Sequence, residues 1–398
     1  MKRFVYRAKD QKTGKILKGS IQAESERAAG KLLIERGYLP DKVAEEGSGF
    51  LEKFNKVTTK DKIVFTRQFA TLIGAGLPLA TSLRTVAEQT QNKLMRSVVE
   101  ELLADVEAGK SLGDAIEKHP KEFDRVYLAL VRAGEMSGTL DESLKRLAFQ
   151  QEKDAAMMSK IRGAMTYPCI VLVVIIAVVA FMMFTVVPQV QGLYEDLGEE
   201  LPALTAFMVA GTEFVIQFWW LLIGIVIGVV WFILQFRKTP TGVKTFGAFK
   251  LNVPMFKNLF RRLYMARFAR TAQILLSTGV SMLDTLKIAG DAMNNVVVQK
   301  SVDEAAELVQ SGKALSESLK NKDYIMPLVP QMASIGEQSG KIDEMLGKAA
   351  QVYEDELDEQ LRTISTMIEP ILMVVMGVVA GGMVGAILFP IYALVGSI

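Results

Sequence analysis

The stretch that decides the fold runs from Val131 to Pro188 and opens with the letters VRAGEMSGTL. It contains a Gly-Glu-Met-Ser-Gly segment, a charged segment with helical spacing, a Tyr-Pro pair at residues 167–168, and an apolar run that closes on Pro188. The same order of landmarks returns 202 residues later, beginning with Gly-Glu-Gln-Ser-Gly at residues 336–340 and closing on Pro390. Self-similarity at a fixed spacing is the signature of a repeated structural unit. The chain is therefore predicted to be a tandem duplication.

The composition predicts a membrane protein that also has soluble domains. Half of the 398 residues are apolar, while 23% are charged and the net charge is only +2. This combination is expected when membrane spans alternate with soluble domains, and it gives no general reason to expect a nucleic-acid partner. Cys169 is the only cysteine, which suits a reducing cytosol or a membrane interior because no intramolecular disulfide can form. Charges recur within the first ten residues, so we expect no cleaved secretory signal.

Three apolar stretches are long enough to cross a bilayer, which takes about 20 residues of helix. They are predicted at residues 169–187, 214–236 and 371–395, and none contains a charged residue. The outer loop over residues 188–213 has no lysine or arginine, whereas the juxtamembrane segment over residues 237–257 is basic and has no acid. Because lysine and arginine concentrate on the cytoplasmic side, the N-terminus and both repeats are predicted to be cytoplasmic. The C-terminus is predicted to lie outside.

The soluble segments predict one small module and two homologous helical bundles. Residues 1–45 combine strand patterns with one short helix, which indicates an α+β module, and residues 46–57 are predicted to be a linker. Helical periodicity predicts a bundle of about six helices over residues 58–165 and its repeat over residues 258–368. The predicted fold class is mainly α: a small N-terminal α+β module, two homologous cytoplasmic six-helix bundles and three transmembrane helices.

Helix caps differ between the two copies. Three hydroxyl residues stand three positions ahead of an acid and predict capping boxes: Thr58 with Asp61, Ser111 with Asp114, and Thr139 with Glu142. In the second copy, Ala314 and Lys341 replace Ser111 and Thr139 and cannot cap through a side-chain oxygen. The second bundle is therefore expected to be the less rigid of the two.

No residue set for catalysis or cofactor binding is predicted. Gly109-Lys110-Ser111 has the order in which a phosphate-binding loop ends, but that motif needs an earlier glycine where this chain has Ala104. We interpret Gly109 as a helix C-cap. His119 is the only histidine and Cys169 begins an apolar run, so no Ser/His/Asp or Cys/His set can be assembled. No zinc-ligand spacing is present either. Oxygen-only binding of a hard cation by Glu135, Asp141 or their counterparts in the second copy is the alternative that the sequence leaves open.

The two Gly-Glu-x-x-Gly segments are the most specific local signal. One interpretation is a helix–helix corner, in which glycine permits a positive φ. The other is an exposed corner that contacts a partner, and the two are compatible. The candidate contact residues are Gly134, Glu135, Gly138, Gly336, Glu337 and Gly340. The acidic run over residues 354–359 is typical of a solvated helix face, with a docking site as the alternative.

The predicted spans contain prolines and small residues but no ionisable group in their interiors. Prolines at both ends of two spans are predicted to mark where the chain enters and leaves the membrane, and Pro188 and Pro390 to end or kink the helix. These prolines are Pro168, Pro188, Pro370 and Pro390. Small residues at four-residue spacing permit close helix packing, within the chain or between copies. The candidates are Gly224, Gly228, Gly377, Gly381 and Gly385.

Together these features resemble one family, the inner-membrane platform proteins of type IV pilus and type II secretion machines, also called the F-type or PilC-type family. The resemblance covers essentially the whole chain, including both corners, the Tyr167-Pro168 and Glu369-Pro370 pairs and Leu201-Pro202. In the N-terminal module it rests on Phe4, Tyr6, Ala8, Gly14, Gly19, Ala23 and Gly37. The chain departs from a strict repeat at Ser281, where the first copy has Pro78.

The resemblance implies a non-enzymatic, multi-pass protein of the bacterial inner membrane with no cofactor or metal. It implies coupling of a cytoplasmic hexameric ATPase to the extraction and polymerisation of pilin or pseudopilin subunits. Further implied partners are other inner-membrane assembly proteins, membrane lipids and a second or third copy of the chain, but no nucleic acid. The alternative is a multi-pass transporter or channel for small solutes, which normally places ionisable groups inside the membrane. The sequence leaves open whether the machine builds pili, secretes proteins or takes up DNA.

Overall fold

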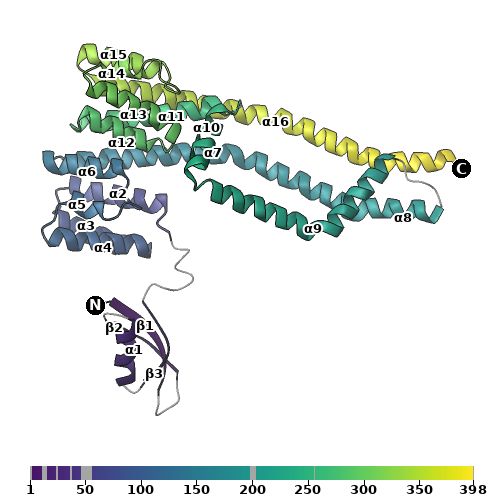
Figure 1. The fold of residues 1–398 in the computed structure, drawn as a ribbon, viewed down its shortest axis with the longest axis horizontal. Helices are drawn as coiled ribbons and strands as arrows, with labels where there is room; N and C mark the ends of the chain where they lie inside the picture. The colour runs from purple at the N-terminus through teal and green to yellow at the C-terminus, as the bar shows by residue number, and fades with distance from the viewer. Residues whose placement is uncertain are drawn as a thin grey trace. The chain divides into compact units, whose positions relative to one another are not determined.

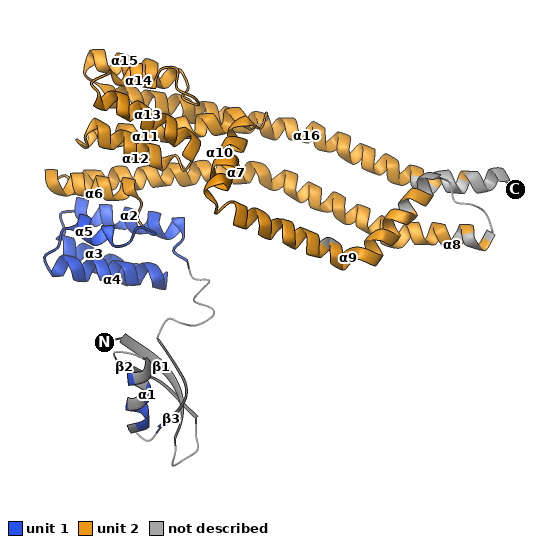
Figure 2. Ribbon diagram, viewed as in Figure 1, with its two compact units in different colours: residues 1–122 blue, residues 123–398 orange. Residues whose placement is uncertain are grey.

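The computed structural model describes most of the chain (Figure 1): residues 2–10, 16–23, 26–35, 38–45, 56–197, 203–254 and 256–397. The chain divides into two compact units, residues 1–122 and residues 123–398 (Figure 2). The division falls within the segment predicted as the first bundle. Most of the predicted linker lies outside the described residues.

The N-terminal part of unit 1 contains a three-stranded antiparallel sheet and one helix. These elements are β1 (Lys2–Asp10), β2 (Ile16–Ala23), α1 (Glu26–Glu35) and β3 (Tyr38–Glu45). The strand order is β2-β1-β3, which leaves β3 at an edge. Pro40 is tolerated in β3 because an edge strand leaves one side of its backbone without ladder partners. Leu33 of α1 is fully buried.

Four helices make up the rest of unit 1: α2 (Thr59–Gly74), α3 (Leu79–Gln89), α4 (Lys93–Glu107) and α5 (Leu112–Glu117). The predicted box at Thr58 is confirmed, because Thr58 Oγ1 accepts from the Asp61 N–H at 3.2 Å and Asp61 Oδ2 accepts from the Thr58 N–H at 2.9 Å. The predicted cap at Ser111 is also confirmed, since its Oγ accepts from the Asp114 N–H at 3.0 Å. Fully buried core side chains include Phe65, Phe69, Leu83, Val86, Met95, Val99 and Leu102.

Unit 2 contains the end of the first copy and the whole second copy. The first-copy helices are α6 (Arg125–Ser137) and α7 (Leu140–Phe181). The second-copy helices are α11 (Lys257–Ser277), α12 (Met282–Ala292), α13 (Val296–Gln310), α14 (Leu315–Leu319), α15 (Leu328–Ser339) and α16 (Ile342–Ser397). Its core is built around α11 and α16 and includes Leu263, Met265, Phe268, Leu286, Val302, Leu346, Tyr353 and Leu357.

Two helices are long and apolar enough to cross a membrane, Leu140–Gly192 and Ile342–Gly385. Each continues without interruption from a charged segment into an apolar one. The second predicted span is not one straight helix. Within α9 (Ala203–Phe236), the segments Val209–Leu221 and Ile223–Phe236 bend by 54°, and Phe218 has non-helical angles. Among the described residues, the candidate spans therefore number two, or three if the bent pair forms one span. A short helix, α10 (Pro240–Asn252), follows α9.

The span prolines lie inside helices. Of the two outcomes predicted for Pro188, an end or a kink, the helix end does not occur: a π-helical turn, η2 (Met182–Val186), precedes Pro188, and α8 (Val187–Leu197) continues the path. A proline clashes with the carbonyl four residues earlier and cannot donate to it. A wider π turn accommodates that missing bond. Pro168 lies within α7, and Pro370 and Pro390 lie within α16, which runs on to Ser397.

Candidate functional site

The last glycine of each corner ends a helix in the left-handed conformation. Gly138 has a φ of 72° and follows α6, and Gly340 has a φ of 70° and follows α15. Each donates its N–H to the carbonyl of the first corner glycine, Gly134 or Gly336. This is the C-cap for which glycine is favoured, because a Cβ strains the backbone at positive φ. The helix-corner interpretation is confirmed.

The first glycine of each corner has a different role, close helix packing. A Cβ on Gly134 would lie 2.5 Å from Ser143 Oγ and 3.0 Å from Leu140 Cα of α7. A Cβ on Gly336 would lie 2.6 Å from Ile342 Cα of α16. Real Cβ atoms do not approach other atoms so closely, because such contacts lie inside van der Waals separation. Each corner therefore joins two helices at a distance that only glycine permits.

The Glu337 carboxylate is turned inward and caps α14. Its Oε1 accepts from the N–H groups of Leu315 at 2.5 Å and Ser316 at 3.3 Å, and its Oε2 accepts from Ser316 Oγ at 2.5 Å. Ala314, the N-cap residue, makes no side-chain cap, as the sequence indicates. The corner thus supplies the cap that the second copy lacks in its own sequence, and Glu337 is half-buried. In the first corner Glu135 is also half-buried, and the most exposed residue is its neighbour Met136, which is 89% exposed.

The predicted capping box at Thr139 is wrong. Thr139 makes no side-chain cap on α7, and its Oγ1 instead lies 2.7 Å from Ser137 Oγ. The Thr139 N–H donates to the Gly134 carbonyl at 2.9 Å. The residue therefore belongs to the C-terminal cap of α6, and its φ of −111° and ψ of 39° are not those of an extended N-cap.

The other chemical candidates have structural roles. Gly109, with a φ of 87°, ends α4, and Lys110 Nζ binds Asp105 at 2.7 Å, so the C-cap interpretation of Gly109 is confirmed. His119 Nε2 lies 3.5 Å from a carboxylate oxygen of Glu101. Asp141 pairs with Lys145 at 3.2 Å. Within the described part of the chain, no cluster of His, Cys, Asp or Glu could hold a metal ion.

The acidic run over residues 354–359 is only partly a solvated face: Asp355 and Glu359 are exposed, while the other three acids pair with neighbouring helices. Glu354 makes a two-pronged pair with Arg270, with both N–O distances at 2.9 Å and both side chains 13% exposed. Glu356 pairs with Arg262 at 2.8 Å. These pairs fix α16 to α11. Asp358 pairs with Lys160 of α7 at 2.5 Å, so the run joins three helices just before the apolar half of α16 begins.

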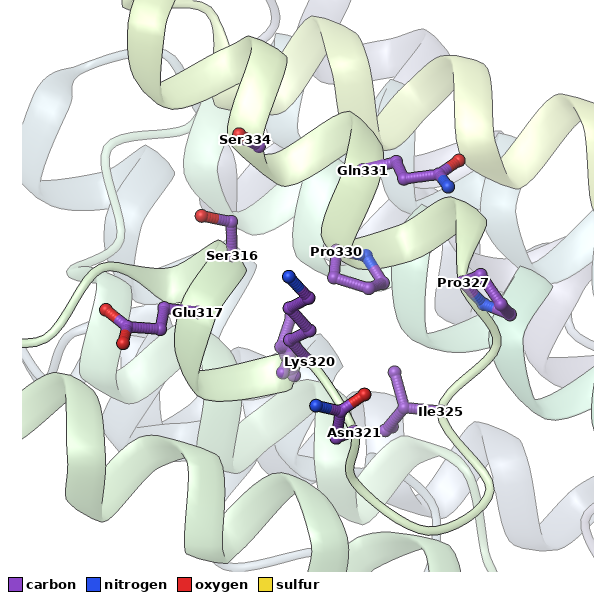
Figure 3. A pocket seen from close by; sticks show the side chains of 10 residues that line it. Ser316, Glu317, Lys320, Asn321, Ile325, Pro327, Pro330, Gln331 and Ser334 are labelled. Atoms are coloured by element: carbon purple, nitrogen blue, oxygen red, sulfur yellow. The ribbon is translucent and has the colours of Figure 1, made fainter.

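Sequence reasoning also missed a pocket of about 630 Å³ between α14 and α15 (Figure 3). The Lys320 side chain extends into it, and the Glu317 carboxylate points away from that lysine (Figure 3). The lining residues are Ser316, Glu317, Leu319, Lys320, Asn321, Ile325, Pro327, Pro330, Gln331 and Ser334. The available signal was the pair Pro327 and Pro330, which the first copy lacks.

The candidate packing glycines have open surroundings. A Cβ on each of them would meet no described atom within 4 Å beyond its own chain neighbours and helix backbone. These residues are Gly224, Gly228, Gly377, Gly381 and Gly385. Among the described residues, none of these glycines therefore lies at a close helix contact.

Comparison with known proteins finds the same internal repeat in this chain. The family model of type II secretion system protein F matches twice, at residues 65–188 and 268–390, and the N-terminal domain model of the same family matches residues 1–44. The two matches begin 203 residues apart and end 202 apart, which confirms the duplication and makes the second copy one residue shorter than the first. The Tyr-Pro and Glu-Pro landmarks lie inside these matches.

Similar curated proteins align over nearly the full chain. The type IV pilus assembly protein PilC of Thermus thermophilus is 36% identical, over 99% of this chain and 98% of its own length. PilC of Pseudomonas aeruginosa is 36% identical, over 91% of this chain and 97% of its own. The type II secretion system protein F of Vibrio cholerae is 33% identical, over 98% of each chain. With both repeats and the N-terminal domain matched, this chain belongs to the type II secretion system protein F family.

Proposed function

We propose that this chain is an integral platform protein of a type IV pilus or type II secretion assembly machine. The observation that carries the proposal is the alignment of relatives with those names over 91–99% of the chain. Helices long and apolar enough to cross a membrane support it. The relatives divide between pilus assembly and secretion, so both machines remain within the proposal.

The mechanical part of the proposal is coupling of a cytoplasmic hexameric ATPase to the extraction and polymerisation of pilin or pseudopilin subunits. Both α7 and α16 run without a break from a soluble helical repeat into an apolar segment. Ion pairs brace them, with Lys160 of α7 to Asp358 and Arg270 of α11 to Glu354. A continuous helix with braced neighbours transmits displacement because packed elements move as bodies. Movement imposed on the repeats would reach the membrane segments.

The proposed membrane arrangement follows the charge distribution. The N-terminal α+β module and both six-helix bundles lie in the cytoplasm, the C-terminus lies outside, and the bent pair in α9 is the second of three spans in the bacterial inner membrane. The basic segment over residues 237–257 supports this orientation. Glycines with open surroundings on α16, among them Gly381, support contact with further copies of the chain as a dimer or trimer. Lipids and other inner-membrane assembly proteins complete the proposed partners.

A reconstitution experiment tests this function against the alternative of a solute transporter or channel. Purified chain is inserted into lipid vesicles, and binding of the cytoplasmic assembly ATPase from the same host is measured together with the flux of small solutes. Saturable ATPase binding without solute flux is expected. Solute flux without ATPase binding would replace the platform by a transport function.

A separate variant tests self-association through α16. Gly381→Leu is expected to give a smaller detergent-solubilised species than the wild type, because leucine keeps the helix backbones apart.

A further inference from the structure

The α14–α15 pocket presents a lysine that has no acidic partner. Lys320 is exposed and makes no ion pair with any described residue. Its side chain reaches the middle of the pocket, between Ser316 of α14 and Pro330 of α15 (Figure 3). Ile325, Pro327 and Pro330 supply an apolar wall beside it. A cation next to an apolar wall is suited to a group that combines a carboxylate with apolar surface.

The loop that shapes the pocket is held in a strained conformation. Asn321 has a φ of 60° and Tyr324 a φ of 65°, and a bulky residue such as tyrosine rarely adopts positive φ. Two contacts hold the loop. Lys322 pairs with Glu304 of α13 at 2.9 Å, and the Arg261 guanidinium lies 5.3 Å from the centre of the Tyr324 ring. Strain of this kind persists only where the surroundings enforce it, and it is concentrated at functional sites.

The first copy provides an internal control for these features. The residue 203 positions before Lys320 is Glu117, so the charge at the centre of the pocket is reversed between the copies. The first-copy segment over residues 118–138 has one proline, Pro120, and none at the positions of Pro327 and Pro330. Among its described residues, no residue other than glycine has a positive φ. The lysine, the two prolines and the positive φ angles that shape the pocket therefore belong to the second copy and are not shared by the repeat.

The corner at residues 336–340 holds this pocket in shape. Glu337 fixes the first turn of α14 through Leu315 and Ser316, and that helix leads directly into Lys320. The Ser316 hydroxyl is committed to Glu337, so the remaining polar side chains of the lining, besides Lys320 itself, are Glu317, Asn321, Gln331 and Ser334. The corner thus has a structural role beneath the pocket, and the pocket itself is the surface available to a partner.

We infer that this pocket binds a segment of the assembly ATPase in which an acidic side chain, paired with Lys320, stands next to an apolar side chain that packs on Ile325, Pro327 and Pro330. The inference rests on the proposed function and adds the surface and its chemistry. Charge complementarity selects the occupant, because an unpaired cation in a partly enclosed site attracts a carboxylate and repels a basic segment.

The test compares charge reversal at the two equivalent positions of the repeat. Full-length chain in nanodiscs is titrated with the purified ATPase, and the dissociation constant is measured for the wild type, Lys320→Glu and Glu117→Lys. Lys320→Glu is expected to weaken binding about tenfold or more, because it opposes like charges. Glu117→Lys is expected to stay within about twofold of the wild type. The dissociation constant of Lys320→Gln is expected to lie between those of the wild type and Lys320→Glu. It should also depend less on salt concentration than that of the wild type.

Hydrogen exchange provides a second readout, which also shows whether the variant is folded. Bound ATPase is expected to slow exchange in the loop over residues 320–327 of the wild type and not of Lys320→Glu, while the unbound proteins exchange alike elsewhere. Equal affinity of the wild type and Lys320→Glu for the ATPase would overturn the pocket inference and leave the platform function standing. Failure of the wild type itself to bind the ATPase would instead contradict the proposed function.

Discussion

Removal of the Glu337 carboxylate is expected to loosen α14. The side chain accepts three hydrogen bonds, from the Leu315 and Ser316 N–H groups and the Ser316 hydroxyl. A hydrogen bond to a charged group contributes about 1.5–3 kcal/mol, and a donor left without a partner costs about 1–3 kcal/mol. Glu337→Ala, which removes all three, is expected to lower the local opening free energy by about 3 kcal/mol. Glu337→Gln keeps an acceptor but loses the charge, so about 1 kcal/mol is expected.

Hydrogen exchange measures this loss directly, since amide exchange in a folded protein follows the local opening free energy. With about 1.4 kcal/mol per factor of ten, exchange in a peptide covering α14 is expected to rise about 100-fold in Glu337→Ala and about fivefold in Glu337→Gln. Adding Ala314→Ser to Glu337→Ala restores an N-cap and is expected to recover about 1 kcal/mol.

The matched control is Gln338→Ala, which changes the exposed neighbour of Glu337 and should leave α14 exchange unchanged. A peptide covering α5, which has its own cap in Ser111, should also be unaffected by Glu337→Ala. If α14 exchanges at the wild-type rate in Glu337→Ala, the corner does not cap that helix and the reasoning fails.

Three further variants test the packing and charge of unit 2. Gly336→Ala is expected to destabilise the protein by more than 2 kcal/mol in thermal unfolding, since its Cβ would lie 2.6 Å from the α16 backbone. The control Gly163→Ala, in open space on α7, should be neutral or slightly stabilising. Equal effects of the two substitutions would contradict the close approach of the helices at Gly336. Glu354→Gln leaves Arg270 without its charged partner and should lower the free energy of chemical unfolding by about 3 kcal/mol. A decrease of less than about 0.5 kcal/mol, as for an ordinary surface substitution, would refute the role of this pair in holding α16 to α11. Partial desolvation and two neighbouring carboxylates raise the pKa of Asp303 above 3.8, so its ionised form opposes folding as pH rises through that raised pKa. Asp303→Asn should therefore raise the melting temperature at pH 7 and lose that advantage below pH 3.8, and a gain that does not depend on pH would count against this account.

The features predicted well from the sequence are those fixed by neighbouring residues. Left-handed glycines at Gly109, Gly138 and Gly340 follow from local backbone sterics, and all three end helices as glycine is expected to. The duplication was readable because the spacing of the landmarks does not depend on how the chain packs. At Thr58 the hydroxyl and the acid that make the box are three residues apart, so the sequence alone contained the whole motif.

The features that could not be predicted depend on residues far apart in the chain. Glu337 caps a helix that starts 22 residues earlier, so nothing adjacent to it indicates the partner. Glu354 and Arg270 are 84 residues apart, and an acidic run with distant arginines looks like a solvated face until α11 and α16 pack. The Lys320 pocket depends on a loop whose positive φ angles arise at Asn321 and Tyr324, where glycine would have been the expected signal.

The most direct test of the platform function is deletion of the gene in its own host, followed by complementation. We predict that the deletion strain makes and inserts pilin or pseudopilin subunits but assembles no filament and secretes no substrate of the machine. The wild-type gene should restore assembly. Normal filaments or normal secretion in the deletion strain, with no second copy of the gene present, would contradict the account.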